Sequence, residues 1–274
     1  MDANNIIRIT RFSDIQTIEK LSVLAKRYKP DSEFYPIGFP LFDDAMDGGV
    51  RAGELITVSG RTGEGKTTFC QQISVNLSDN NIPSLWFSYE MGFWYLNDKF
   101  KRISKNDLAI YSPIEIISSE LKFLEEEIIE AREKACKVVF IDHLHYLVPL
   151  GGIENTSLLV GGIVRELKKI AVRNQIIIFL IAHTKKIYQG ENLDLSSLRD
   201  SALVACESDY VYLIERIRQE KGKLDSQGFL YTNQTKIQLA KNRRKGDLKY
   251  LLCEYSDNRF KPSIDYGTYQ FNAF

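Results

Sequence analysis

The chain has 274 residues, and its 36 Lys and Arg balance its 36 Asp and Glu, so the formal net charge is zero. This length allows roughly 70–75% of the unfolded surface to be buried, which suits one large domain or one domain with an appendage. The charge balance excludes a general attraction to nucleic acids or membranes, so any contact with a polyanion must come from a local cluster.

The four cysteines lie far apart and form no CxxC pair, which argues against a disulfide framework or a zinc module. The N-terminus has no basic segment leading into an apolar one, and no apolar run approaches the roughly 20 residues of a membrane span. We therefore expect a soluble protein of a reducing compartment such as the cytoplasm. An organelle matrix or nucleoid stays open as an alternative.

The N-terminal part of the chain predicts one amphipathic helix. A capping box opens it at Ser13, and apolar side chains recur at helical spacing up to Tyr28, before Pro30 ends the pattern. A loop-like stretch follows, so we expect residues 1–34 to form an arm and residues 35–274 to form the main domain. The apolar stripe of the helix packs either on a neighbouring chain or on its own domain, and the sequence leaves both open.

From residue 35 onward, short apolar runs alternate with longer helical patterns. The strand candidates are residues 55–58, 84–89, 137–142, 176–182 and 209–215. The helical patterns cover residues 66–79, about 93–104, 117–135 and 156–174, and the long loops are expected at 184–199 and 217–234. This alternation predicts an α/β fold with a mostly parallel sheet that is covered on both faces. The last apolar runs, 235–241 and 248–255, flank the turn-like NRRKGD and predict a C-terminal antiparallel hairpin.

The stretch GRTGEGKTTF, residues 60–69, follows the first strand candidate and opens the first helix. It matches the phosphate-loop pattern in full, in the strand-to-helix context that the motif requires. Backbone N–H groups of such a loop surround phosphates, the lysine reaches the terminal phosphates, and the threonine hydroxyl binds Mg²⁺. We expect ATP or another nucleoside triphosphate, with Mg²⁺, to contact Gly60, Arg61, Thr62, Gly63, Glu64, Gly65, Lys66, Thr67 and Thr68.

Polar residues stand where the later strand candidates end, which is the edge of an open α/β sheet where ligands bind. Asp142 directly follows the apolar run VVFI, and a carboxylate there is the expected second Mg²⁺ partner beside Thr67. The alternative is an ordinary strand-end aspartate.

Glu90 ends another strand candidate and carries a more specific implication. An ATPase that hydrolyses its substrate needs a group to orient and deprotonate the attacking water, and a glutamate at this place can do so. The alternative is an acid in the first turn of the following helix. His183 ends a third strand candidate, where it contacts the γ-phosphate or has only a structural role. His143 and His145 form an H-x-H pair, but no Cys or acidic ligand stands at a suitable spacing for a metal site.

Taken in order, these motifs resemble the motor domain of hexameric replicative helicases. This RecA-like group includes DnaB-type, phage primase-helicase and Twinkle-type enzymes. The similarity covers about residues 36–256, and the stretches that carry it are GRTGEGKTTF, LWFSYEM, VVFIDHLHYL, LIAHTKK, LRDSALVACESDYVYLIER and LAKNRRKGDLKYLLCEY. The HTKK ending and the KNR-x-x-GD segment are more similar to the Twinkle and phage branches than to the DnaB branch.

The resemblance implies roles for individual residues. Lys66 and Thr67 would bind phosphate and Mg²⁺, Glu90 would be the catalytic base, Asp142 the second-motif acid and His183 the γ-phosphate sensor. It also implies that Lys241 and Arg243 reach into the nucleotide site of a neighbouring subunit. The two lie two apart at the end of a strand, so their side chains leave on one face, and a guanidinium suits the charge on a transferred phosphoryl group. The alternative is a pair of solvated charges at a hairpin turn, a description that fits Arg244 and Lys245 better.

For DNA, the resemblance points to the stretch Leu198 to Ala202, where relatives use an LR-(E/D)-S-G loop to grip phosphates of a single strand. Arg199, Asp200 and Ala202 are the expected contacts, with Lys185 and Lys186 as weaker candidates. Ala202 replaces the usual glycine, so its backbone N–H contact requires a negative φ. The alternative is that Arg199 is an ordinary loop or helix arginine.

The resemblance as a whole implies a RecA-like P-loop ATPase that forms a ring, expected to be a hexamer. We expect it to hydrolyse ATP or another triphosphate, to move along single-stranded DNA and to unwind duplex in DNA replication. Primase and loader proteins are possible partners, and no membrane is expected. Two alternatives remain, namely a recombination mediator or clock-type ATPase that does not unwind, and a nucleotide-dependent assembly module with weak catalysis.

Overall fold

The computed structural model describes Val23 and residues 33–149, 156–185, 193–198, 201–219 and 231–263, apart from the side chains of 201 and 202. The chain divides into two units, Met1–Ser32 and Glu33–Phe274, and the account below concerns the second. The helix predicted from Ser13 to Tyr28 therefore lies, except for Val23, outside the described residues.

A nine-stranded sheet with the order β3-β2-β4-β5-β1-β6-β7-β8-β9 forms the centre of the fold. The parallel part consists of β1 (Leu55–Gly60), β2 (Ser84–Ser88), β3 (Ile110–Tyr111), β4 (Val138–Asp142), β5 (Ile177–His183) and β6 (Tyr210–Arg218). The antiparallel part consists of β7 (Tyr231–Asn242), β8 (Lys249–Ser256) and β9 (Arg259–Pro262). The predicted α/β fold, with a mostly parallel sheet and an antiparallel C-terminal hairpin, is confirmed.

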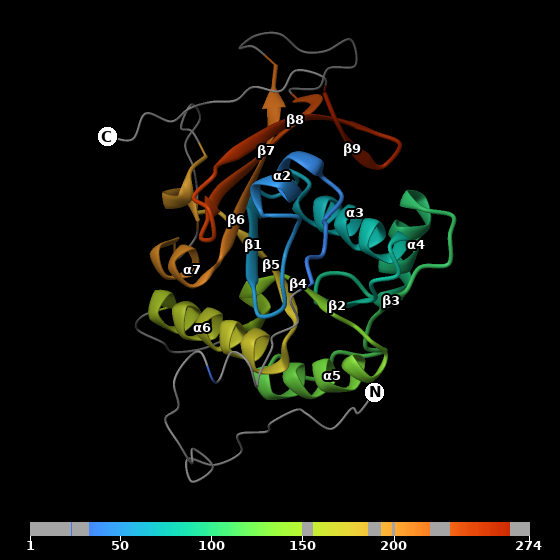
Figure 1. The fold of residues 1–274 in the computed structure, drawn as a ribbon, viewed down its shortest axis with the longest axis vertical. Helices are drawn as coiled ribbons and strands as arrows, with labels where there is room; N and C mark the ends of the chain where they lie inside the picture. The colour runs from blue at the N-terminus through green and yellow to red at the C-terminus, as the bar shows by residue number, and fades with distance from the viewer. Residues whose placement is uncertain are drawn as a thin grey trace. The chain divides into compact units, whose positions relative to one another are not determined.

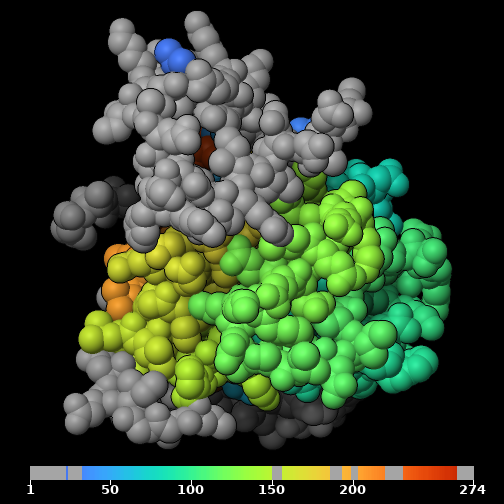
Figure 2. Space-filling view, turned by 90° about the horizontal axis from the view of Figure 1, so that it is seen from below, coloured from blue at the N-terminus to red at the C-terminus, as the bar shows by residue number. Residues whose placement is uncertain are grey.

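Helices cover both faces of the parallel part, as Figure 1 shows. Their bounds are α2 (Pro40–Ala45), α3 (Lys66–Asp79), α4 (Phe93–Ile103), α5 (Leu121–Glu133), α6 (Thr156–Asn174) and α7 (Ser201–Glu207), with 3₁₀ turns η2 (Leu144–Leu147) and η3 (Leu195–Ser197). Apolar side chains of α3 and α4 pack on one face, and those of α5 and α6 pack on the other. Figure 2 shows this second face, with α6 in yellow beside α5 in green.

Buried side chains on neighbouring parallel strands lie next to each other because the strands are paired residue by residue. Trp86 pairs with Phe140, and Phe140 pairs with Phe179, so three large rings line up across β2, β4 and β5. The ring centroids of Phe140 lie 4.7 Å from Trp86 and 4.9 Å from Phe179, and both pairs are stacked. The alternate residues of the same strands point to the opposite face, as the period of two requires. This register also brings the carboxyl ends of β2, β4, β5 and β1 to one edge.

The structure adds elements that the sequence pattern did not predict. The two-residue β3 and the short β9 extend the sheet at its two ends, and β6 and β7 run further into the stretch predicted as a loop at 217–234. Two-residue and four-residue strands are too short to show a period, which explains why the pattern did not reveal them.

The stacked rings lead to a prediction on stability. Replacing Phe140 by alanine removes a fully buried ring from between two others, so the free energy of unfolding should fall by about 3–5 kcal/mol. Ile117→Ala is the matched control, because Ile117 is 75% exposed and its loss should change stability by less than about 0.5 kcal/mol. Urea unfolding of both variants checks this, and equal midpoints for the two would contradict it.

Candidate functional site

The phosphate loop connects β1 to the first turn of α3 and depends on its glycines. Gly65 has a φ of 96°, a left-handed conformation that side chains rarely adopt, and it is the N-cap of α3. A Cβ on Gly60 would lie 2.4 Å from the carbonyl oxygen of Ile214 on β6, so only glycine permits this close pairing of β1 with β6. The sequence therefore shapes the loop before any ligand binds.

Lys66 is the first residue of α3 and lies mostly buried under the loop. Its Nζ donates to the carbonyl oxygen of Arg61 at 2.9 Å, so the side chain spans the loop from one end to the other. Burial lowers the pKa of Lys66, while the carboxylates of Asp142 and Glu90 act in the opposite direction. An anionic ligand in the loop would relieve this desolvation because it offers the ammonium group a partner.

Thr67 and Asp142 form the pair expected for a divalent cation. The Thr67 hydroxyl donates to Asp142 Oδ2 at 2.8 Å, and Asp142, the last residue of β4, is 1% exposed. Burial raises the pKa of Asp142 to about 6, against the opposing effect of the Thr67 hydrogen bond. Two oxygens at this separation fit adjacent corners of an octahedral Mg²⁺ site with bonds of about 2.0–2.1 Å. These residues therefore fit Mg²⁺.

Glu90 lies two residues beyond β2 and faces the same edge. Its Oε1 lies 2.9 Å from Nδ1 of His143 and 3.9 Å from Nε2 of His183, and its side chain is 42% exposed. Helix α4 begins only at Phe93, with Gly92 as its N-cap and no acidic residue in its first turn. The geometry thus speaks against a role for Glu90 as a helix-capping acid, while its role as a catalytic base stays a prediction.

The three histidines of the chain gather at this edge. The centroid of the His183 ring, at the end of β5, lies 4.3 Å from that of His143. The His145 ring centroid lies 5.6 Å from that of His143 and 5.9 Å from that of His183. The pKa of both His143 and His183 is lowered to about 4, so both rings are neutral near pH 7. Burial is the larger cause of this shift, and nearby positive charge is the smaller one. The sequence revealed no acidic ligand near the H-x-H pair, but the fold supplies Glu90 from another strand.

These side chains surround one cavity of about 250 Å³. It is lined by Thr62, Gly63, Gly65, Lys66, Thr67, Thr68, Glu90, Asp142 and His183. Most of the predicted phosphate, metal and catalytic residues therefore share a single space. Of the predicted loop residues, Gly60, Arg61 and Glu64 do not line it. Glu64 is 2% exposed, and its carboxylate accepts a hydrogen bond from the backbone N–H of Arg216, which ties the loop to β6.

A second cavity of about 250 Å³ adjoins the first across the loop. It shares Gly63, Gly65 and Thr68 with the first cavity and is otherwise lined by Glu64, Arg216, Asn233, Thr235, Tyr255 and Phe260. Apart from Glu64, sequence reasoning missed these residues, because they come from β6 to β9 and carry no local motif. An aromatic side chain that stands alone at the end of a strand gives no signal until the fold places it beside the loop.

Lys241 and Arg243 do not line the cavity on their own chain. Lys241 Nζ donates to the carbonyl oxygens of Ala205 at 2.6 Å and Ser208 at 2.7 Å. Arg243 pairs with Asp209 at 3.0 Å and donates to the carbonyl oxygen of Cys206 at 2.6 Å. Both side chains thus leave on one face, at the C-terminal end of α7, where cations are favoured by the helix dipole.

The neighbouring charges differ from each other in a way that the sequence did not predict. The prediction that Arg244 is a solvated charge is wrong. Its guanidinium pairs with Glu54 at 2.5 Å and donates to the carbonyl oxygen of Met46. Only 17% of its side chain is exposed. Lys245 pairs with Asp47 and is 44% exposed, as expected of a turn residue. Arg244 therefore holds the turn to the rest of the domain.

The predicted DNA segment is described only in part. Arg199, Asp200 and Lys186 lie outside the described residues, whereas Ala202 lies in α7 with a helical backbone. Thr184 forms an antiparallel bridge with Leu198, and the Lys185 N–H donates to the Ser197 carbonyl oxygen at 3.0 Å. Leu198, the first residue of the predicted DNA segment, therefore lies beside Thr184, the residue that follows His183.

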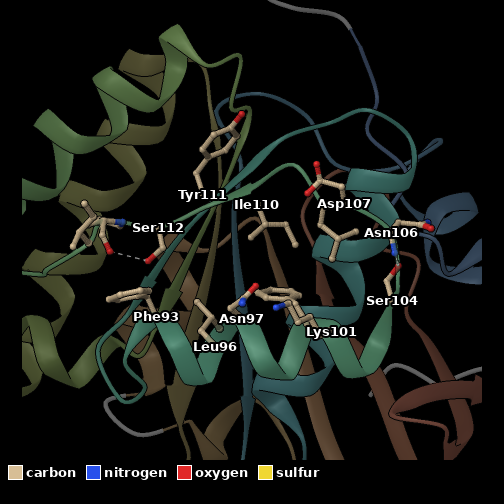
Figure 3. Close-up of a pocket in the computed structure, with 14 residues that line it drawn as sticks. Phe93, Leu96, Asn97, Lys101, Ser104, Asn106, Asp107, Ile110, Tyr111 and Ser112 are labelled. Carbon is tan, nitrogen blue, oxygen red and sulfur yellow. Dashed lines mark hydrogen bonds between the residues drawn. The ribbon is translucent and has the colours of Figure 1, made fainter.

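A third cavity of about 340 Å³ lies away from the phosphate loop. Figure 3 shows α4 along one wall and the stretch from Ser104 to Ser112 along the other. Its apolar lining includes Leu96, Phe100 and Ile110. No predicted phosphate, metal or DNA residue contributes to it.

Among the described helices, none is long and apolar enough to cross a membrane.

Comparisons with known proteins agree with this geometry. The family model of the DnaB-like helicase C-terminal domain matches residues 93–261. A structure described as a DnaB-like replicative helicase and its interactions with primase aligns with a TM-score of 0.71 at 18% identity, over 90% of this chain and 67% of that one. The ATPase domain of G40P aligns with a TM-score of 0.74 at 18% identity, over 88% of this chain and 96% of that one.

A DNA repair protein of Schizosaccharomyces pombe, rhp57, is 26% identical over 136 residues, which are 41% of this chain and 38% of that protein. The chain thus matches less than half the length of this curated relative. The solved structures establish the fold, which is that of RecA-like ATPase domains. Because the family model covers more than half of its residues, the chain belongs to the DnaB-like helicase C-terminal domain family.

Proposed function

We propose that this chain hydrolyses a nucleoside triphosphate at interfaces between its own copies and uses the cycle to move along single-stranded DNA and unwind duplex. The observation that carries the proposal is that Lys66, Asp142 and Glu90 share one cavity, while Lys241 and Arg243 do not reach it. The family adds weight, because the DnaB-like helicase model spans most of the sheet. We expect a ring, in keeping with the hexamer that the family resemblance implies.

In this proposal, each group on the cavity has one task. Backbone N–H groups of the loop and Lys66 hold the phosphates. Thr67 and Asp142 would hold Mg²⁺, which when bound would supply positive charge to the phosphate oxygens. The Glu90 carboxylate orients a water molecule toward the γ-phosphate and accepts its proton as the water attacks. His183, neutral near pH 7, offers the γ-phosphate a hydrogen bond. Its neighbour Thr184 forms a bridge with Leu198, the first residue of the predicted DNA segment.

The second cavity suits the rest of the nucleotide. It opens on the other side of the same loop, so a triphosphate in the first cavity would place its nucleoside there. Tyr255 is 39% exposed and can stack on a base, and Arg216 lies on the same wall. Neither side chain selects a particular base by hydrogen bonds, so the identity of the base stays open.

The positions of Lys241 and Arg243 support a trans-acting role for both side chains. On their own chain they bind the carbonyl groups at the end of α7 and Asp209, and the Arg243 side chain is 50% exposed. An exposed guanidinium in front of a helix end can exchange one set of acceptors for a phosphate of the adjacent copy. A head-to-tail ring places the same face of every chain against the loop of the next.

The primase and the DNA enter the proposal through similarity. One structural neighbour is described together with its interactions with primase, and we include a primase and a loader protein among the expected partners. The similarity to a DNA repair protein favours a second candidate, a RecA-like ATPase that binds DNA or protein without unwinding. The experiments below separate the two.

The first prediction concerns Glu90. Glu90→Gln keeps the size of the side chain but removes its basicity, so steady-state hydrolysis should fall at least about 100-fold while triphosphate binding is retained. Hydrolysis is measured by phosphate release and binding by a fluorescent nucleotide. Glu130→Gln, on the exposed face of α5, is the control and should keep wild-type turnover. Unchanged turnover in Glu90→Gln would remove Glu90 from the mechanism.

The second prediction tests completion of the site between copies. Arg243→Ala should lower turnover by about 10³-fold, since it removes a cation that faces the transferred phosphoryl group. Mixing it with Glu90→Gln should restore activity, because about a quarter of randomly formed head-to-tail interfaces then hold both intact groups. Lys245→Ala is the control and should behave as wild type in both assays. If the mixture stays inactive, the two residues act within one chain.

The third prediction concerns DNA. Arg199→Ala should weaken binding to single-stranded DNA at least about tenfold at fixed salt, because one lost charge is repeated around the ring. Strand separation of a forked duplex should be lost with it. Arg102→Ala, an exposed residue of α4 paired with Asp98, is the control. If wild-type protein shows DNA-stimulated hydrolysis without strand separation, the second candidate function replaces the first.

A further inference from the structure

We propose that Glu90, His143 and His183 form a binding site for a transition metal such as Zn²⁺, separate from the Mg²⁺ site at Thr67 and Asp142. One ligand atom from each of the three residues lies within 4.8 Å of the others. Each residue follows or ends a different strand, β2, β4 or β5, so the site exists only because these strands are neighbours.

The distances fit a metal site. Glu90 Oε1 lies 2.9 Å from His143 Nδ1 and 3.9 Å from His183 Nε2. In a tetrahedral zinc site with bonds of about 2.0–2.1 Å, neighbouring ligand atoms are about 3.4 Å apart. The two distances from the Glu90 oxygen lie on either side of this value, and all three ligand atoms lie within 4.8 Å of one another, so side-chain movements can bring them to the spacing of a metal site.

The donor set selects the kind of metal. Two imidazole nitrogens and one carboxylate oxygen suit Zn²⁺ and its first-row neighbours, whereas Mg²⁺ prefers oxygen alone. Three protein ligands also leave one position of a tetrahedron for water or a phosphate oxygen. The Thr67 hydroxyl and Asp142 carboxylate form the oxygen site nearby, so the two kinds of ion have different places on one edge of the sheet.

The ring nitrogens are in a suitable state for coordination. His143 Nδ1 is buried and has no hydrogen-bond partner among the described residues, although the Glu90 carboxylate is close to it without hydrogen-bond alignment. The Lys66 ammonium opposes a second cation, and the carboxylates of Glu90 and Asp142 balance that charge.

A metal ion at this place has a functional consequence. It would occupy Glu90 and His183, the groups that the proposed hydrolysis uses as base and γ-phosphate contact. We therefore expect Zn²⁺ to inhibit turnover. This consequence rests on the proposed function, but metal binding itself does not.

Cobalt binding tests the site without any nucleotide. The full chain carries Cys206→Ser, because Cys206 is the exposed cysteine and its thiol would bind cobalt or zinc elsewhere. Titration with Co²⁺ should produce visible absorption bands of a low-coordinate complex, saturate at one ion per chain and be reversed by Zn²⁺. His143→Ala and His183→Ala should each weaken Co²⁺ binding at least about tenfold, the range seen when the ligand shell of a metal is damaged.

His145→Ala is the matched control. Its ring lies 5.6 Å from that of His143 and outside the group of three ligands, so Co²⁺ affinity should stay within about threefold of the parent. Circular dichroism shows that each variant is folded. The proposal would be overturned if all three histidine variants kept the Co²⁺ affinity of the parent protein. It would also be overturned if all three lost affinity to the same extent.

A separate measurement distinguishes this inference from the proposed function. Zn²⁺ is added to the Cys206→Ser protein during triphosphate hydrolysis in excess Mg²⁺. Inhibition that is relieved in His143→Ala supports both ideas. Co²⁺ binding as predicted, without inhibition by Zn²⁺, leaves the metal site standing and contradicts the role of Glu90 in hydrolysis.

Discussion

The hydrogen bond from the Thr67 hydroxyl to the Asp142 carboxylate joins the two halves of the site. It links the first turn of α3 to the last residue of β4, two segments that are distant in sequence. A carboxylate that is 1% exposed needs such a partner, because burying it alone would be costly. With this contact in place, the phosphate loop faces the ends of β2 and β5, and Glu90 and His183 fall on the same cavity.

The parts of this site that could be predicted are those encoded locally. The phosphate loop is a continuous stretch whose glycines and flanking elements can be read from the sequence, and Asp142 follows an apolar run that predicts a buried strand. The alternation of runs and helical patterns also predicted the parallel sheet, because each strand is long enough to show its character. Such features require no knowledge of which strands are neighbours.

The parts that could not be predicted depend on strand order. The approach of Glu90 to His143 and His183 follows from β2, β4 and β5 lying side by side, and the apolar runs give no order. The same holds for Tyr255, which reaches the loop only because the antiparallel strands fold back beside β6. Arg244 looked like a solvated turn residue, and only its tertiary partner Glu54 reveals that it is held to the domain.

The central claim is that the active site is completed by a neighbouring copy, and α7 is the element on which this depends. Carbonyl oxygens at its C-terminal end accept hydrogen bonds from Lys241 and Arg243. Its start lies within the predicted DNA segment, whose first residue, Leu198, forms a bridge with Thr184. If the proposed function holds, these contacts would connect His183 to the DNA segment and, through α7, to Lys241 and Arg243.

The most direct measurement is a crystal structure of the assembled protein with Mg²⁺, a non-hydrolysable triphosphate and single-stranded DNA. The account predicts that Arg243 leaves Asp209 and lies within hydrogen-bond distance, about 3 Å, of a γ-phosphate oxygen bound to the adjacent copy. A structure in which every Arg243 stays on Asp209 of its own chain, while the triphosphate is enclosed by one copy alone, would contradict it.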